Sequence, residues 1–168
     1  AHVASGVSLS DYGKYADTIS VCFSKGLGAP IGSMALSTRE RINSARVWRK
    51  RYGAGMRQVG LLAAAADYAI THHMDDLNHD HRRAKALATA IARVDSSLID
   101  PSSVATNIVG LNLKALGITA AELATRTKES GLLIGALGPH FARLVTHRDF
   151  DDAQCDQAIE ILEKTLVA

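Results

Sequence analysis

The feature that most constrains the fold is a short strand pattern that runs directly into a glycine-rich segment. Residues 18–23 alternate apolar with smaller side chains and are rich in β-branched residues, which indicates a β-strand. The segment that follows, 24–33, reads Ser-Lys-Gly-Leu-Gly-Ala-Pro-Ile-Gly-Ser. Its glycines and proline end the strand, and the small residues within 31–36 indicate a second strand paired with it as a hairpin.

The later part of the chain predicts a small α+β domain. Residues 75–94 predict a helix with an apolar stripe toward a core and a polar face that includes Asp80. Strand and helix patterns then alternate as strand 106–113, helix 119–130, strands 132–136 and 141–146, and helix 151–167. We expect an antiparallel sheet covered by helices on one face.

Composition excludes several classes of protein. The 168 residues are 47% hydrophobic and carry a net charge of +2, which excludes a disordered tail, and no apolar run is long enough to span a bilayer. The basic run 39–57 lies on one amphipathic helix in a nearly neutral chain, so we expect a solvated face and neither a nucleic-acid nor a membrane partner. Cys22 and Cys155 indicate reduced thiols and a cytoplasmic location, with Cys22 expected in the core.

Lys25 is the candidate for chemistry. It stands at the end of an apolar strand among small residues, and a half-buried ammonium in that setting has a depressed pKa, as a Schiff-base nucleophile needs. The alternative is a surface lysine beside a turn that merely uses glycine. A phosphate-binding P-loop is excluded, because Gly-Lys-Ser/Thr does not occur in that order.

Two further sequence patterns can be interpreted in more than one way, a group of histidines and an apolar helix. Four histidines, His72, His73, His79 and His81, lie close in the sequence, but they straddle a helix junction, so we expect no metal site. The helix over 59–70 is apolar almost all round, which predicts that it is buried or packed against a partner chain.

Three motifs in order give the chain a resemblance. The segment 24–33, the segments 46–50 and 53–58, and the closing 142–147 together resemble the low-specificity L-threonine aldolases, over essentially the whole chain. That family consists of aspartate-aminotransferase-like, fold-type-I enzymes that use pyridoxal 5′-phosphate. The chain departs from the family pattern at Ala54, where relatives usually have a third glycine.

The resemblance implies roles for four side chains. Lys25 would form the Schiff base with the cofactor aldehyde, and Arg57 would reach the cofactor phosphate, commonly from a neighbouring subunit. Lys50 would lie near the phosphate or the substrate carboxylate, and Arg143 would bind the α-carboxylate. From its residues alone, Arg143 is equally well explained by an ion pair with a helix carboxylate. The implied reaction is retro-aldol cleavage of L-threonine or L-allo-threonine, β-hydroxy amino acids, to glycine and acetaldehyde.

The resemblance also implies an α/β fold: the C-terminal portion of a fold-type-I enzyme. Residues 1–58 would be the last part of the cofactor-binding large domain, 59–75 a linking helix, and 76–168 a small α+β domain with an antiparallel sheet. The family's phosphate-binding loop, ring-stacking histidine and pyridine-nitrogen carboxylate have no match, so we expect a truncation at Ala1, a missing N-terminal half and no activity of this chain alone. We expect a homodimer or homotetramer. The alternatives are a β-eliminating amino-acid lyase and a non-catalytic dimerisation or scaffold fragment.

Overall fold

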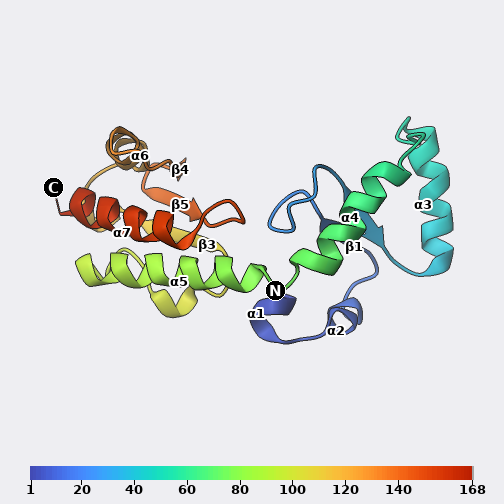
Figure 1. The fold of residues 1–168 in the computed structure, drawn as a ribbon, viewed down its shortest axis with the longest axis horizontal. Helices are drawn as coiled ribbons and strands as arrows, with labels where there is room; N and C mark the ends of the chain where they lie inside the picture. The colour runs from blue at the N-terminus through green and yellow to red at the C-terminus, as the bar shows by residue number, and fades with distance from the viewer. Residues whose placement is uncertain (168) are drawn as a thin grey trace. The chain divides into compact units, whose positions relative to one another are not determined.

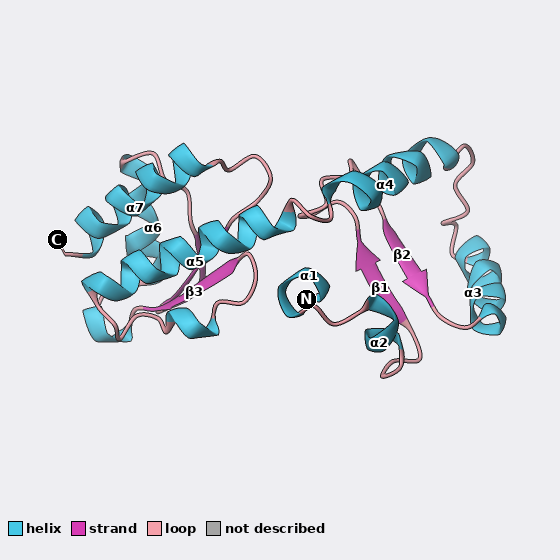
Figure 2. Ribbon diagram, turned by 60° about the horizontal axis from the view of Figure 1, so that its bottom comes forward, coloured by secondary structure: helices cyan, strands magenta, loops and turns pink. Residues whose placement is uncertain are grey.

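The computed structural model describes residues 1–167, which form two compact units (Figures 1 and 2). The first unit is Ala1–Asp76, and the second begins at Leu77. Within the described residues, no helix combines the length and the apolar character that crossing a bilayer requires.

A two-stranded hairpin is the sheet of the first unit. Strands β1 (Ile19–Cys22) and β2 (Ser33–Leu36) run antiparallel, as Figure 2 shows. Their register places Ile19 opposite Leu36. Two short helices precede them, α1 (His2–Ser5) and α2 (Leu9–Gly13), and the Ser8 side chain caps α2 by accepting from a backbone N–H. The predicted hairpin is therefore confirmed, with strands shorter than the sequence pattern indicated.

Two longer helices complete the first unit. Helix α3 (Arg39–Arg51) begins at Thr38, whose side chain caps it, and it buries none of its residues. Helix α4 (Gly60–His73) buries only Ala66 and Ala69, and Leu61 is 80% exposed. The expectation that this apolar helix is buried is therefore wrong within the first unit, where most of the α4 surface is exposed.

The second unit is the predicted antiparallel sheet with helices. Strands β3 (Ile108–Asn112), β4 (Gly135–Gly138) and β5 (Phe141–Val145) pair in the order β3-β5-β4, antiparallel throughout. The other elements are α5 (Leu77–Val94), α6 (Ala120–Glu129), α7 (Asp152–Leu166) and the short 3₁₀ turns η1 (Pro101–Ser103) and η2 (Lys114–Leu116). Helices α5 and α7 lie side by side (Figure 1).

One face of this sheet holds the core. Alternate residues of β3 and β5 are buried, among them Val109, Leu111 and Leu144, and they pack with Ile91 of α5 and Leu162 of α7. Burying each such side chain contributes about 1.5–3 kcal/mol. The other residues of the central strand β5 are exposed, so the opposite face of the sheet is open.

Two sequence expectations about burial are wrong. Asp80 is 2% exposed, because the first turn of α5 packs on the end of β5, where the Thr146 hydroxyl donates to the Asp80 carbonyl at 2.7 Å. Arg83 lies 3.8 Å from the Asp80 carboxylate and offsets its charge. Cys22 is exposed rather than in the core, because burial alternates along β1 and Cys22 falls on the outward side.

Candidate functional site

The segment 23–32, here called the Lys25 loop, is a folded turn between β1 and β2. The Phe23 carbonyl accepts from Ala29 N at 2.9 Å, Phe23 N donates to the Gly32 carbonyl at 3.0 Å, and Gly28 N donates to the Lys25 carbonyl at 2.8 Å. Gly28 (φ 71°) and Gly32 (φ 118°) have backbone conformations that L side chains rarely adopt. The loop closes on itself because its glycines permit these two turns.

The loop points its apolar side chains inward and Lys25 outward. Phe23, Leu27 and Ala29 are buried, whereas Lys25 is exposed and no described residue hydrogen-bonds or ion-pairs with its amine. The expected half-burial of Lys25 is therefore wrong. The strand alternation ends at Phe23, where the chain turns, so the next apolar side chain to face inward is Leu27.

A histidine from α4 holds the loop from outside. His73 Nδ1 lies 2.7 Å from the Leu27 carbonyl, a partly buried hydrogen bond between residues 46 positions apart. The Tyr68 ring packs edge-on against the His73 ring, with 5.5 Å between centroids. Sequence reasoning missed this role, because nothing local to His73 points to so distant a partner. Within residues 1–167, no group of three or more His, Cys, Asp or Glu is placed to hold a metal ion.

Lys50 and Arg57 belong to the same unit as Lys25. The Lys50 side chain folds over Gly55, where a Cβ would lie 2.9 Å from Lys50 Cδ. The flexible Lys50 side chain can yield to such a Cβ, so the glycine that this turn requires for its backbone is Gly53, which has a φ of 77°. Arg57 is exposed, and no described acidic group pairs with Lys25, Lys50 or Arg57. Three cations without acidic partners are donors of the kind that bind a phosphate dianion.

Arg143 belongs to the second unit and lies on the open face of its sheet. Its cross-strand neighbours are Gly110 on β3 and Gly135 on β4, so its row of the sheet carries no other side chain. A Cβ on Gly110 would lie 2.9 Å from the Phe141 ring, which shows that this ring covers Gly110. Arg143 forms no ion pair with any residue from 1 to 167, so these residues supply no helix carboxylate as its partner.

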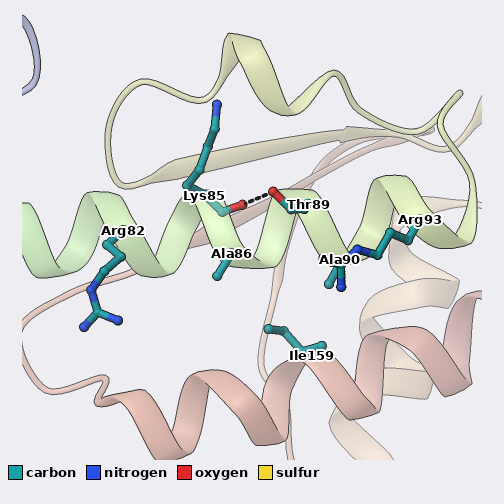
Figure 3. A pocket seen from close by; sticks show the side chains of 7 residues that line it. All are labelled: Arg82, Lys85, Ala86, Thr89, Ala90, Arg93 and Ile159. Atoms are coloured by element: carbon teal, nitrogen blue, oxygen red, sulfur yellow. Dashed lines mark hydrogen bonds between the residues drawn. The ribbon is translucent and has the colours of Figure 1, made fainter.

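A hollow of about 370 Å³ lies between α5 and α7 of the second unit (Figure 3). Two of its three basic side chains are already engaged: Arg82 binds the Asp152 carboxylate at 2.9 Å, and Lys85 extends away from α7 and donates to the Pro101 carbonyl. Only Arg93 is left without a partner among residues 1–167. The Thr89 hydroxyl donates to the Lys85 carbonyl at 2.8 Å. The hollow therefore offers little free polar chemistry to a ligand.

Comparison with known proteins gives a family and close relatives. Residues 1–115 match the family described as Beta-eliminating lyase. The chain is 32% identical over 168 residues to low-specificity L-threonine aldolase 1 of Arabidopsis thaliana, covering 99% of this chain and 47% of that protein. It is 36% identical over 154 residues to the low specificity L-threonine aldolase of Escherichia coli K12, covering 92% of this chain and 44% of that protein.

A solved structure shows the same fold. It is a candidate aromatic amino acid beta-eliminating lyase/threonine aldolase from Exiguobacterium sp. 255-15, with a TM-score of 0.75 and 18% identity over 98% of this chain and 49% of that one. The α/β fold predicted for part of a fold-type-I enzyme is thereby confirmed. The chain spans about half the length of the curated relatives that it matches.

Proposed function

Because this chain belongs to the beta-eliminating lyase family, we propose that the protein containing it is a pyridoxal-phosphate-dependent lyase. Its reaction is carbon–carbon cleavage of L-threonine or L-allo-threonine to glycine and acetaldehyde. The observation that carries the proposal is the place of Lys25, an unpartnered amine presented outward by a glycine-shaped loop that is fixed on buried anchors. The named relatives at 32% and 36% identity support the choice of reaction.

The chemistry of the donor groups fits pyridoxal phosphate. A primary amine and two further cations without acidic partners match the aldehyde and phosphate that this cofactor presents. When bound, the cofactor supplies an electron sink that accepts the electron pair of the Cα–Cβ bond. The Lys25 amine, free of any ion pair, holds the cofactor covalently and must lose its proton at Nζ to do so.

Charged side chains position the remaining groups in this proposal. Arg57 binds the phosphate with its planar guanidinium fork, and Lys50 adds a second positive charge near the phosphate or the substrate carboxylate. Arg143 binds the α-carboxylate. Three observations support this role for Arg143. It is exposed on the open face of a sheet, its cross-strand neighbours are both glycines, and it has no ion-pair partner among residues 1–167.

The proposal includes a domain division and an assembly. Residues 1–58 are part of a cofactor-binding domain, 59–75 a linking helix and 76–168 a small domain, a division supported by the boundary between compact units at Asp76. The activity is assigned to the protein that has this chain together with the other half that its relatives have. A homodimer or homotetramer is supported by the exposed apolar residues Leu61, Tyr68 and Ile70 of α4. A cytoplasmic location is supported by two free cysteines.

Two alternatives remain in the proposal. The family description favours a β-eliminating reaction, which would release pyruvate or a related keto acid from a suitable amino acid. The exposed apolar face of α4 favours a dimerisation or scaffold module without catalysis. Product analysis separates the three, because only the aldolase releases acetaldehyde and glycine from threonine.

The experiment uses the full-length protein loaded with pyridoxal phosphate. We expect L-threonine to yield equal amounts of acetaldehyde and glycine, and Lys25→Ala to abolish the reaction. Lys14→Ala is the matched control, because Lys14 is an exposed lysine of the same unit whose only partner is Asp11. The β-eliminating alternative would be supported by 2-oxobutanoate and ammonia in place of acetaldehyde and glycine, because β-elimination removes the threonine hydroxyl group and leaves the Cα–Cβ bond intact. Full activity of Lys25→Ala would refute the role of Lys25.

A further inference from the structure

We propose that His73 is the positioning residue that fixes the Lys25 loop and thereby the direction of the Lys25 amine. This inference rests on the proposed role of Lys25 and adds a residue that neither the motifs nor the relatives point to. The observation that carries it is the 2.7 Å hydrogen bond between His73 Nδ1 and the Leu27 carbonyl.

The other backbone hydrogen bonds around Lys25 begin and end within the loop. Those at Phe23, Lys25 and Gly28 close its turns but do not tie them to any other element. The Leu27 carbonyl is different, because it is held by a side chain from helix α4. The buried side chains of Phe23, Leu27 and Ala29 hold the loop by packing, and the His73 bond adds a directional restraint on its backbone. Loss of that bond therefore changes how often the loop opens.

Leu27 is placed to transmit this restraint to Lys25. The bond from Gly28 N to the Lys25 carbonyl closes the turn 25–28, and Leu27 lies inside that turn with its side chain 8% exposed. A shift of the Leu27 peptide therefore moves the backbone of Lys25. Displacement of a reacting group by about 1 Å can reduce a rate about 100-fold.

The direction of the hydrogen bond fixes the chemical requirement at position 73. A carbonyl oxygen only accepts, so His73 Nδ1 carries the proton and donates. Both the Nδ1–H tautomer and the imidazolium satisfy this requirement. An asparagine amide also donates from a similar distance along the side chain, whereas alanine cannot donate.

The adjacent His72 provides a matched control. It lies in the same last turn of α4, is exposed, and contacts the Tyr68 ring at 4.3 Å between centroids. Within residues 1–167, His72 makes no hydrogen bond to the Lys25 loop. Replacing His72 shows whether any change at the end of α4 disturbs the protein. Replacing His73 tests the hydrogen bond to the Leu27 carbonyl itself.

The test compares His73→Ala, His73→Asn and His72→Ala in the full-length protein by two readouts. Hydrogen–deuterium exchange at the Gly28 and Ala29 amides should be about 2–10-fold faster in His73→Ala, the effect of losing one neutral hydrogen bond. With L-threonine, kcat should fall about 10–100-fold while KM stays within about twofold, because His73 does not touch the substrate. His73→Asn should bring both the amide exchange rates and kcat most of the way back to the wild-type values. His72→Ala should leave the exchange rates and kcat unchanged.

The outcomes separate this inference from the proposed function. Unchanged exchange in His73→Ala would overturn the anchor itself. Faster exchange with unchanged kcat, or equal losses in His72→Ala and His73→Ala, would overturn the positioning role. If the wild-type protein releases no acetaldehyde from L-threonine, the proposed function and the catalytic part of this inference are overturned. The exchange data then still decide whether His73 holds the loop in place.

Discussion

Gly110→Ala should destabilise the second unit because of one specific clash. The added Cβ would lie 2.9 Å from Phe141 Cζ and 3.0 Å from Cε2, closer than real Cβ contacts come. Gly110 is not in a left-handed conformation, so alanine is compatible with its backbone. The packing of the Phe141 ring is therefore the only obstacle that the structure gives.

The magnitude follows from two opposing effects. Overpacking costs about 1–3 kcal/mol, and because the Phe141 ring is 45% exposed on the open face of the sheet and can swing aside, we expect the lower part of that range, about 1–2 kcal/mol. Alanine in place of glycine restricts the unfolded chain, which recovers about 0.4–1 kcal/mol. We expect a net loss of about 0.5–1 kcal/mol in the free energy of unfolding, with a fall in Tm of about 4–8 °C per kcal/mol for a domain of this size.

The assay is urea and thermal unfolding of Gly110→Ala, Phe141→Ala and the double variant. In the Phe141→Ala background the alanine at position 110 should be neutral or slightly stabilising, because the ring is gone. Gly135→Ala is the control on the other side of Arg143, since its Cβ would meet only the Arg143 carbonyl, at 3.4 Å. The reasoning fails if Gly110→Ala is neutral, or if its cost is the same with and without the ring.

Three further predictions concern single side chains. Arg143→Ala in the full-length protein should raise KM for L-threonine about 10–100-fold, since a charged hydrogen bond is lost, and Arg143→Lys should recover only part; steady-state kinetics with unchanged KM would contradict this. Because burial raises the pKa of Cys155 while Cys22 is exposed, a thiol reagent at pH 8 should modify Cys22 fast and Cys155 slowly; equal rates would contradict the structure. Hydrogen bonds from two arginines lower the pKa of Asp152, so its stabilising effect is present above about pH 3.8 and is lost as the pH falls further. Asp152→Asn should therefore unfold more easily than the wild-type protein at pH 7, and the difference in the free energy of unfolding should shrink as the pH falls below about 3.8.

Local signals predicted the elements of the fold well. The alternation in residues 18–23 predicted the first strand of the hairpin, and the small residues within 31–36 predicted the second. The apolar stripe of α5 predicted its buried side, which includes Leu87 and Ile91. These features depend on neighbours a few residues away, so periodicity and turn rules suffice for them.

Long-range contacts decided what the sequence did not reveal. Lys25 is exposed because the glycine turns bring Leu27 inward, and His73 anchors that loop from 46 positions away. Asp80 is buried because its carbonyl accepts a hydrogen bond from Thr146. Each of these three features depends on which helices and strands pack together in the tertiary fold, and local sequence patterns do not specify that packing.

The most direct test of the central claim is to locate the residue that holds the cofactor. The full-length protein is incubated with pyridoxal phosphate, reduced with borohydride, digested and analysed by mass spectrometry. The account predicts one stable pyridoxyl label, on Lys25, which is absent in Lys25→Arg. A label confined to another lysine such as Lys50, or no label at all, would contradict it.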